Sequence, residues 1–358
     1  EYKVMGLAPY GDPSVYKDKL NRIFCTTDNK FWIDQKYFTW EYSDKIMFNK
    51  KLCQLLELPP RLPEDTLTQD HKNLAAALQK VYEERFLKLV ERAKLITGSE
   101  NLCLGGGCAY NGVANSLAYK HFKSIHIPFA PSDAGSAIGV CLDNHSQISP
   151  YQGPYFTNDS VRKTLKKYDG KLIYFNLDDK TIVRKTSELL RDQKIVAWFQ
   201  DRMEFGARAL GNRSILASPT NPKMREKLNY VIKKREGFRP FAPSVIQEEA
   251  HKFFDIKEPV PYMNQVVKAK VDFIPAATHV DGTCRVQTVH KLRNPKYYSL
   301  LEEVGRLTNI PVLLNTSFNL KDETITMTPE QAIDRYLSSD IDFLVINNFL
   351  IKKHEVKR

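Results

Sequence analysis

Three stretches in the second half of the chain combine arginines with glycines and small polar residues. They are residues 202–214 (RMEFGARALGNRS), 233–245 (KKREGFRPFAPSV) and 315–319 (NTSFN). Arginine side chains bind phosphate and carboxylate oxygens through paired hydrogen bonds and keep their charge at working pH. Glycines allow backbone N–H groups to approach the same oxygens. The chain is therefore expected to fold so that these separate stretches build one oxyanion site.

The basic charge of the chain is concentrated in one segment. Residues 202–239 hold ten Lys and Arg against three Asp and Glu, a net charge of +7 out of +11 for the whole chain. A non-specific nucleic-acid binder usually spreads its basic charge along a face or a tail, so a nucleic-acid partner is not expected. Lys223, Arg225 and Lys227 have the spacing of a solvated helix face. The better ligand-binding candidates lie among glycine, proline and aromatic residues; they are Arg202, Arg208, Arg213, Arg235 and Arg239.

Length and composition favour two soluble domains. A chain of 358 residues is long enough for two hydrophobic cores. No apolar run approaches the roughly 20 residues that span a bilayer, and no signal-peptide pattern is present. The six cysteines are scattered without a C-x-x-C pair, which fits reduced thiols and a cytoplasmic location. Because the turn-rich motif Met5–Gly11 follows almost directly on Glu1, we expect an upstream segment to be missing.

The first half of the chain contains two successive strand–turn–helix patterns. A long helix is predicted at 66–96, with Thr66 and Gln69 forming a capping box. A strand at 101–104 then leads through a glycine turn to a helix ending near residue 119. A second strand at 124–128 leads to the turn and helix at 131–139. Such repeated units are typical of an α/β nucleotide or metal site.

The second half begins after an expected linker at 145–170 and again predicts an α/β pattern. The predicted strands are 172–175, 195–199, 311–314 and 343–346, and the predicted helices are 179–192, 222–233, 297–308 and 329–338. The last helix starts at Thr328-Pro329-Glu330, with proline at the first helical position.

Together these motifs resemble the O-carbamoyltransferases of the NodU/CmcH type, which modify nodulation factors, cephamycins and aminoglycosides. The resemblance covers nearly the whole chain. Its most specific parts are residues 202–216, 233–245, 278–282 with 285–288, and 315–319. It implies a partial actin/sugar-kinase-like (ASKHA) domain at 1–165, followed by a YrdC-like α/β domain at 166–358. The first domain is similar to the threonylcarbamoyl transferases of tRNA modification.

The resemblance also implies a reaction. Carbamoyl phosphate and ATP would form carbamoyl adenylate in the second domain, and the carbamoyl group would pass to a hydroxyl of a small-molecule or sugar acceptor in the first. The implied catalytic residues are Arg208, Lys234, Arg235 and Arg239, with Lys233 as the alternative to Lys234. The implied substrate contacts are Arg202, Arg213, His279, Asn315, Ser317 and Asn319, and the implied nucleotide-binding residues are Gly105, Gly106, Gly107 and Asn111.

A divalent metal is expected from the resemblance, as Fe²⁺ in the first domain and as Mg²⁺ with ATP. The resemblance makes Asp133 a metal ligand, together with two histidines of an H-x-x-x-H motif. No two of the eight histidines stand at i and i+4, so the metal site is incomplete in this chain. Without the resemblance, Asp133 is better explained as a helix N-cap.

Several alternatives remain open from the sequence. The isoelectric point near 9.2 permits a tRNA threonylcarbamoylation enzyme, and the missing histidine pair permits a non-catalytic nucleotide-binding scaffold. Asn315–Ser317 could be an ordinary strand-end turn, and His279 could be a turn histidine. The aromatic segment 20–65 could form an acceptor surface or simply pack in a core. Members of the family often form homodimers.

Overall fold

The computed structural model describes residues 2–27, 30–142 and 148–354. Packing divides the chain into two compact units. Unit 1 holds Glu1–Leu102 with Leu117–Ser124, and unit 2 holds Cys103–Ser116 with Ile125–Arg358. Both glycine-containing turns of the first half therefore pack with unit 2, whereas the sequence-based range 1–165 places them in the first domain.

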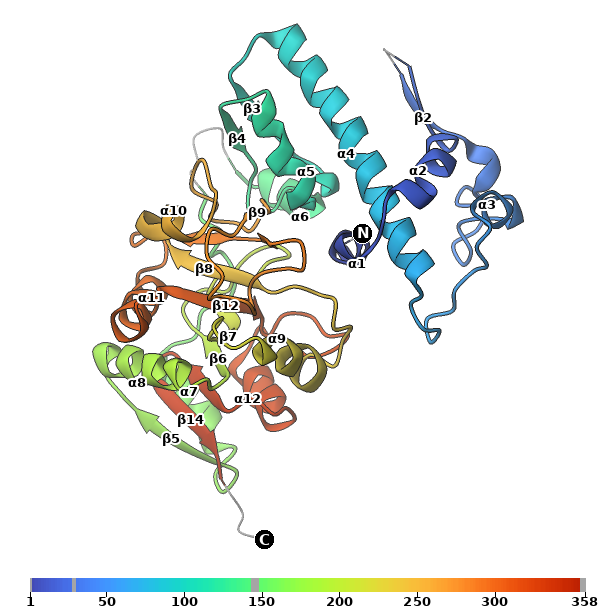
Figure 1. The fold of residues 1–358 in the computed structure, drawn as a ribbon. Coiled ribbons are helices and arrows are strands. Elements are labelled where there is room, and N and C mark those ends of the chain that lie inside the picture. Colours follow the sequence, from blue (N-terminus) through green and yellow to red (C-terminus); the bar gives the residue numbers. More distant parts are fainter. Residues whose placement is uncertain (1, 28–29, 143–147, 355–358) are drawn as a thin grey trace. The chain divides into compact units, whose positions relative to one another are not determined.

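Unit 1 is built mainly from helices around α4 (Figure 1). Its helices are α1 (Tyr2–Leu7), α2 (Ser14–Asn21), α3 (Lys50–Leu56) and α4 (Gln69–Thr97), with 3₁₀ turns η1 (Ala8–Tyr10), η2 (Gln35–Tyr37) and η4 (Ala118–Lys120). A short antiparallel hairpin joins β1 (Phe24–Thr26) to β2 (Phe31–Ile33). The Met5–Gly11 segment, expected as a turn, begins inside α1.

The predicted long helix is confirmed as α4, but its start differs from the prediction. The capping residue is Thr68 rather than Thr66, and its backbone N–H donates to Nδ1 of His71 (3.0 Å). Ala77 and Val81 of α4 are buried in one cluster with residues of α2. The contact is close at Gly11, where an added Cβ would lie 2.1 Å from the carbonyl oxygen of Lys72.

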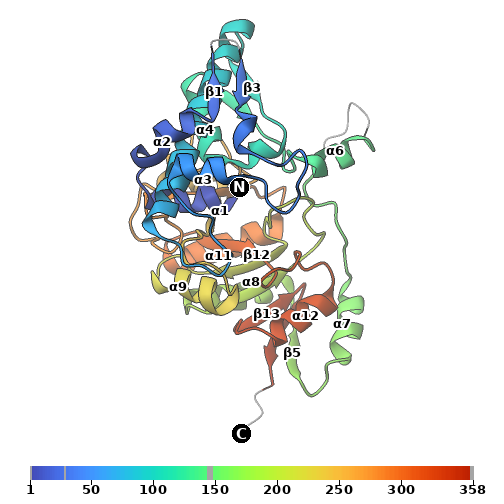
Figure 2. The ribbon, with the colours of Figure 1, turned by 90° about the vertical axis from the view of Figure 1, so that its right-hand side faces the viewer.

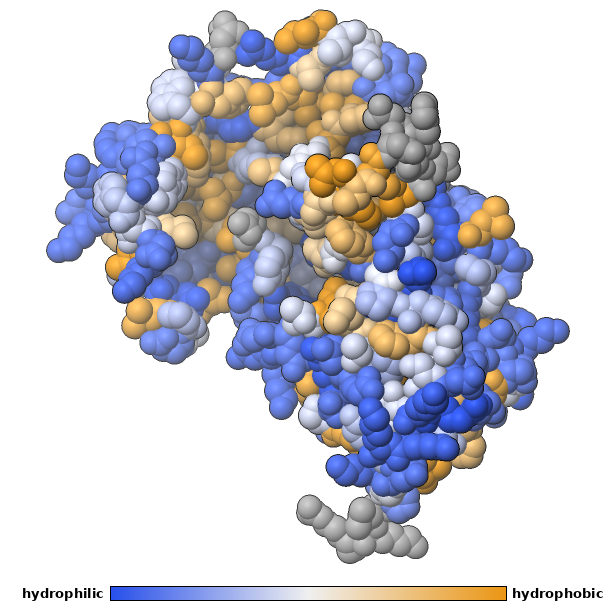
Figure 3. All heavy atoms as spheres, turned by 180° about the vertical axis from the view of Figure 1, so that it is seen from behind, coloured by the Kyte–Doolittle hydropathy of each residue, from blue (hydrophilic) through white to orange (hydrophobic). Residues whose placement is uncertain are grey.

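The aromatic segment of unit 1 is only partly a core. Tyr37 is buried in the hydrophobic cluster. In contrast, Trp32 is 49% exposed and Tyr42 is 76% exposed. Figure 3 shows apolar atoms over unit 1 and also beside the grey residues of unit 2, whereas the side of unit 2 near the C-terminal end is mainly hydrophilic. Core packing therefore explains only some of these aromatic residues.

Unit 2 contains a mixed eight-stranded sheet in the order β11-β8-β12-β7-β6-β13-β14-β5. Only the pairs β11–β8 and β6–β13 are parallel. The strands are β5 (Leu172–Asn176), β6 (Val196–Phe199), β7 (Arg213–Ala217), β8 (Ala242–Ile246), β11 (Gln287–Val289), β12 (Val312–Ser317), β13 (Phe343–Ile346) and β14 (Phe349–Lys353). The predicted strands are confirmed as β5, β6, β12 and β13, and the other four were missed.

Helices cover both faces of this sheet, because alternate side chains of each buried strand enter different clusters. Val196 and Trp198 of β6 face α8 (Asp179–Arg191) and α11 (Pro295–Thr308). Ala197 and Phe199 face the opposite side, with α9 (Lys223–Glu226), the π-helix η5 (Lys227–Ile232), α10 (Ala250–Phe253) and α12 (Pro329–Leu337). Figure 1 shows α8 and α11 on one side of the sheet, and α9 and α12 face the viewer in Figure 2.

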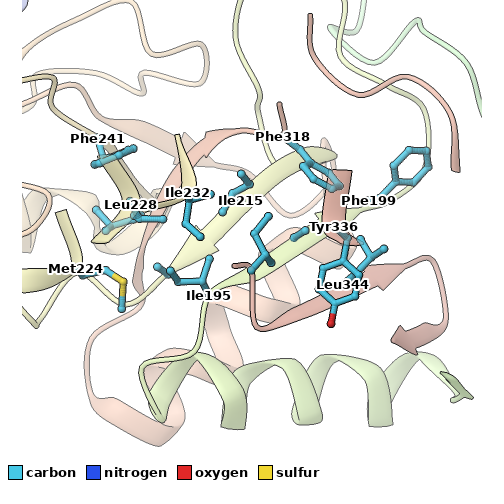
Figure 4. Packing of buried hydrophobic residues seen from close by; sticks show 14 of the residues in the cluster. Ile195, Phe199, Ile215, Met224, Leu228, Ile232, Phe241, Phe318, Tyr336 and Leu344 are labelled. Carbon is cyan, nitrogen blue, oxygen red and sulfur yellow. The ribbon is translucent and has the colours of Figure 1, made fainter. Parts of the chain in front are cut away.

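The hydrophobic cluster that contains Ala197 and Phe199 supports the candidate site. Figure 4 shows side chains from η5, α12 and the sheet converging on Ile215 of β7. Leu228 and Ile232 of η5 are buried there, as is Phe318, which follows β12. This packing fixes the end of η5 beside the end of β12. All predicted helices of the second half are confirmed, with 222–233 divided between α9 and η5.

The expected linker at 145–170 is wrong over much of its length. Residues 145–147 lie outside the described residues. Residues 158–166 form α7 (Asn158–Lys166), whose N-cap Thr157 accepts a hydrogen bond from the backbone N–H of Ser160. Val161 and Leu165 are fully buried in the core, so this segment belongs to unit 2 as a packed helix.

Both strand–turn–helix patterns of the first half are confirmed. They comprise β3 (Asn101–Cys103), η3 (Gly107–Tyr110), α5 (Gly112–Leu117), β4 (Ser124–His126) and α6 (Asp133–Gly139). Unit 2 also contains the antiparallel pair β9 (Val267–Lys268) and β10 (Thr283–Cys284), and the 3₁₀ turn η6 (Gln247–Glu249). Across the residues that the structure describes, no helix combines the length and apolarity required to cross a membrane.

Candidate functional site

A buried carboxylate shapes the first basic motif. Glu204 is 4% exposed, and its Oε1 accepts from the backbone N–H groups of Leu210 (2.6 Å), Asn212 (2.7 Å) and Arg213 (3.2 Å). Hydrogen bonds to an ionised acceptor are stronger than neutral ones. The loop that carries Arg208 is thus wrapped around Glu204, a residue that sequence reasoning did not select.

Arg213 has structural partners. It is fully buried, and Nη1 donates to the carbonyl oxygens of Gln200 and Asn212, the latter at 3.0 Å. Nη2 donates to the carbonyl oxygens of Pro154 and Asp201, both at 3.1 Å. Burial lowers the pKa of Arg213 to about 10. These contacts favour a role in holding the loops together over the predicted substrate contact.

Lys233 reaches across unit 2 to the end of β12. Its Nζ donates to the carbonyl oxygen of Asn319 (2.9 Å), to Oδ1 of Asn319 (2.7 Å) and to the carbonyl oxygen of Ser317. Oγ of Ser317 also donates to Oδ1 of Asn319 (2.7 Å). The structure therefore brings together the second and third motifs through a buried lysine.

Three guanidinium groups surround Lys233. Burial, together with the positive charges of Arg235, Arg239 and Arg335, holds the pKa of Lys233 well below its usual value, and Glu323 opposes the shift. Nε of Arg235 donates to Oδ1 of Asn229 (2.8 Å), whereas Arg239 pairs with Glu236 (3.4 Å) and Arg335 with Glu323 (2.7 Å). Glu236 and Glu323 offset only part of the positive charge of Lys233 and these arginines, and the remaining excess would favour an anionic ligand.

Lys234, the lysine preferred from the sequence, is placed differently. It is exposed and has a left-handed backbone conformation (φ 47°). Lys233 follows the π-helix, and its N–H donates to the carbonyl oxygen of Leu228. The geometry therefore favours Lys233 over Lys234 as the motif's functional lysine, the reverse of the sequence-based choice.

Arg208 lies beside Arg285 and Tyr110. Its guanidinium carbon is 5.5 Å from the centre of the Tyr110 ring, and its buried Nε has no hydrogen-bond partner among the described residues. Burial lowers the pKa of both arginines, and the charge of Arg208 lowers that of Arg285 further. Both stay charged at working pH, so this pair also favours an anionic ligand.

Asn315 connects the two cationic groups. It is 2% exposed, and its Nδ2 donates to Oε1 of Gln287 (2.8 Å) and to the carbonyl oxygen of Ala209 (3.3 Å). Its buried Oδ1 has no partner among the described residues. Asn315 and Ser317 lie two residues apart on β12, so the loop of Arg208, through Ala209, and the side chain of Lys233 both contact the same end of that strand.

Arg202 and His279 are placed by contacts with loops and turns of unit 2. Arg202 is exposed, and Nη1 of its side chain donates to the carbonyl oxygen of Gly153 (3.4 Å). His279 is buried in a turn, where its N–H donates to the carbonyl oxygen of Thr283 (2.8 Å) and its carbonyl oxygen accepts from Gly282 (2.9 Å). Their substrate roles stay predictions.

The glycine turn of the first half lies open. Gly105, Gly106 and Gly107 are exposed, and an added Cβ at any of them would meet nothing within 4 Å. The N–H of Gly106 donates to the carbonyl oxygen of Pro131 (2.6 Å), which joins this turn to the second one. Oδ1 of Asn111 accepts from the N–H of Ala114 (3.2 Å) and so caps α5.

The residues near Asp133 do not fit a metal ion. Asp133 is exposed and is the first residue of α6, and Ser132 rather than Asp133 occupies the N-cap position. Among residues 2–27, 30–142 and 148–354, no group of three His, Cys, Asp or Glu side chains could hold a metal. A single carboxylate is a poor site.

Three residues of this site were not predicted from the sequence. Arg285 lies within the quoted motif at 285–288, so its type and position offered a signal. Glu204 and Arg335 gave none, because a single carboxylate in a loop and a single arginine on a helix are ordinary surface residues.

Two family models match the chain: Carbamoyltransferase N-terminus over residues 1–142 and Carbamoyltransferase C-terminus over residues 187–353. Similar proteins include an uncharacterized protein of Synechocystis sp. (39% identical), nodulation protein NolNO of Sinorhizobium fredii (37%) and nodulation protein NolO of Bradyrhizobium diazoefficiens (36%). Each alignment covers 99% of this chain and respectively 64%, 53% and 66% of the relative, so the chain spans between about half and two thirds of their length. These matches, together with the paired motifs at the end of β12, place the chain in the carbamoyltransferase family.

Proposed function

We propose that the chain supports ATP-dependent O-carbamoyl transfer. Carbamoyl phosphate is activated as carbamoyl adenylate, and the carbamoyl group passes to a hydroxyl of a small-molecule or sugar acceptor. The observation that carries the proposal is the set of basic groups at the end of β12. Nζ of the buried Lys233 reaches Ser317 and Asn319, and Arg235, Arg239 and Arg335 lie close enough to lower its pKa. Such a set suits a small donor with several negative charges.

The reaction has two stages. Water attacks carbamoyl phosphate, so that phosphate leaves and carbamate forms. A carbamate oxygen then attacks the α-phosphorus of ATP, pyrophosphate leaves and carbamoyl adenylate forms. An acceptor hydroxyl oxygen then attacks the carbamoyl carbon; its proton is released and AMP leaves. Fixed cations stabilise the charge that develops on the phosphoryl oxygens in such a step.

We assign the donor oxygens to Arg239 and Arg208, and to Lys233, whose Nζ would exchange one of its contacts with Ser317 or Asn319 for a donor oxygen. Oδ1 of Asn315 is a buried acceptor without a partner among the described residues, and it suits the amide N–H of a carbamoyl group. We assign Arg285 to the same donor oxygens as Arg208, whose charge acts on it. Enclosure of this group would also protect the labile adenylate from water.

The nucleotide is assigned to the same unit. Gly105–Gly107 form an open turn shortly before Tyr110, and Asn111 follows Tyr110 directly. The guanidinium carbon of Arg208 is 5.5 Å from the centre of the Tyr110 ring. A phosphate chain running along this turn would approach the donor site. Mg²⁺ would accompany the phosphates of ATP as part of that substrate. Since the residues around Asp133 do not fit a metal ion, no step is assigned to a resident metal.

The test measures phosphate and pyrophosphate release from carbamoyl phosphate and ATP. Arg208→Ala and Arg239→Ala should each lower both rates by about a hundredfold, the size expected for loss of one charge-stabilising group. Lys223→Ala is the matched control, because Lys223 is an exposed cation of the same basic segment. Full rates in both arginine variants would refute the site, and ATP binding without pyrophosphate release would indicate a scaffold instead.

A further inference from the structure

We infer that Arg335 is a positioning residue for Lys233, acting through Glu323 and the turn that carries Asn319. The inference rests on the proposed function, because that function places Lys233 in the donor site. Arg335 lies on α12, 102 residues after Lys233 in the chain.

The largely buried side chain of Arg335 makes two directed contacts. Its side chain is 12% exposed; Nε lies 2.7 Å from Oε2 of Glu323, and Nη1 donates to Oγ1 of Thr326 (2.6 Å). An arginine fork can hold two partners in a fixed geometry, which a lysine cannot do. Arg335 therefore fixes the middle and the end of the 319–326 turn together.

Glu323 passes this constraint to Asn319. The carbonyl oxygen of Glu323 accepts from Nδ2 of Asn319 (2.7 Å), and its Oε2 accepts from the N–H of Leu320 (3.2 Å). With Nδ2 directed to Glu323, Oδ1 of Asn319 is directed to Nζ of Lys233 (2.7 Å). The orientation of one amide group thus links Arg335 to Lys233.

The other end of the turn is anchored in the core. Thr326 is fully buried, and its N–H donates to the carbonyl oxygen of Phe318 (2.8 Å). The helix below is also fixed: Thr328 and Gln331 form its capping box, and Ile333 is fully buried. Arg335 therefore acts from a rigid base rather than from a mobile surface.

The charges of Arg335 and Glu323 act on the pKa of Lys233 in opposite directions. The charged groups that act on Lys233 are Arg235, Arg239, Arg335 and Glu323, of which only Glu323 raises its pKa. Neutralising Arg335 should raise the pKa of Lys233, and neutralising Glu323 should lower it. Opposite shifts would show that both charges act on Lys233, and the change of kcat against KM, with its partial recovery in Arg335→Lys, tests the positioning role.

The experiment compares Arg335→Gln, Arg335→Lys and Glu323→Gln with the unmodified protein. Steady-state phosphate release is measured against carbamoyl phosphate concentration and pH, and the titration of Lys233 is followed by NMR on lysine-labelled protein. Arg306→Gln is the control, because Arg306 pairs with Glu303 (2.6 Å) on the exposed side of α11.

We expect Arg335→Gln to lower kcat about tenfold with a smaller change in KM, since a misplaced group acts mainly on the transition state. Arg335→Lys should recover part of that loss. The Lys233 titration should move to higher pH in Arg335→Gln and to lower pH in Glu323→Gln. The Arg306→Gln control should match the unmodified protein.

Two outcomes separate this inference from the proposed function. If the unmodified protein releases no phosphate but the opposite NMR shifts appear, the function fails and the electrostatic link from Arg335 and Glu323 to Lys233 stands. If the protein is active and neither variant moves the Lys233 titration, or both move it in the same direction, the positioning role is refuted.

Discussion

The ammonium group of Lys233 lies 2.7 Å from Oδ1 of Asn319, although the two residues are 86 positions apart. This hydrogen bond joins the end of η5 to the end of β12 in unit 2. Because Lys233 is also surrounded by guanidinium groups, the contact marks the point where the separate basic motifs become one site.

Replacing Lys233 should have a much larger effect than replacing its neighbour. Lys233→Ala removes the buried cation that contacts Ser317 and Asn319, so pyrophosphate release should fall by about a hundredfold or more. Lys234→Ala removes an exposed side chain and should change the rate less than about threefold. Pyrophosphate release from labelled ATP, measured in samples quenched at successive times, gives both rates.

Circular dichroism of both variants is the necessary control, because a buried lysine also holds backbone carbonyl groups. If Lys234→Ala abolished activity while Lys233→Ala retained it, the sequence-based choice would be restored and the site geometry would be wrong.

The unfolding free energy should depend on the charge of Lys233. Burial and three neighbouring arginines lower the pKa of Lys233 in the folded protein. Between that lowered pKa and the ordinary lysine pKa of about 10.4, the unfolded chain binds more protons than the folded chain. The contribution of Lys233 to the free energy of unfolding should therefore rise with pH across that window.

Urea unfolding of the unmodified protein and of Lys233→Met, measured across this pH range, gives that contribution by difference. The difference should shift in favour of the unmodified protein as the pH rises. A shift of the opposite sign would mean that the folded protein holds the Lys233 proton more tightly than the unfolded chain does.

Gly211 should tolerate no side chain. Its φ is 105°, and an added Cβ would lie 2.2 Å from a ring carbon of the fully buried Tyr297. Gly211→Ala combines backbone strain with overpacking and should cost about 2–4 kcal/mol of unfolding free energy. Denaturant titration measures it. Gly139→Ala is the control, since nothing lies within 4 Å of its added Cβ; equal stability of the two variants would contradict the packing.

Glu204 should support both stability and activity. In Glu204→Gln, an NH₂ group brings new donors to a pocket where Oε1 accepts three backbone N–H groups. We expect a loss of about 1–3 kcal/mol in unfolding free energy and a lower rate, because the Arg208 loop is released. Glu226→Gln changes an exposed carboxylate of the same basic segment and serves as the control. Unchanged stability in Glu204→Gln would refute the role of Glu204.

The regular elements of unit 2 with clear periodicity could be predicted from the sequence. The helix α12 has its capping box at Thr328 and Gln331, and β13 is an uninterrupted apolar run. In contrast, β7 begins with Arg213 and Ser214, which are polar and fully buried. A strand that begins with polar residues lacks the apolar pattern by which buried strands are predicted. Its polar groups can be buried only because tertiary contacts supply their hydrogen bonds.

The choice between two lysines shows a second limit. The sequence places Lys233 and Lys234 at the end of a basic helix, where either could face the site. The π-helix η5 changes the rotation per residue, and Lys233 is the one directed into unit 2. Local pattern does not reveal a π-helix, and only the packing of Leu228 and Ile232 fixes its orientation.

The most direct test of the central claim is the calorimetric titration of carbamoyl phosphate into the purified protein and into the Arg208→Ala/Arg239→Ala double variant. If these two arginines belong to one donor site with Lys233, the unmodified protein should bind carbamoyl phosphate and the double variant should bind at least about a hundredfold more weakly while remaining folded. Equal affinity in the two proteins would contradict a shared donor site at the end of β12.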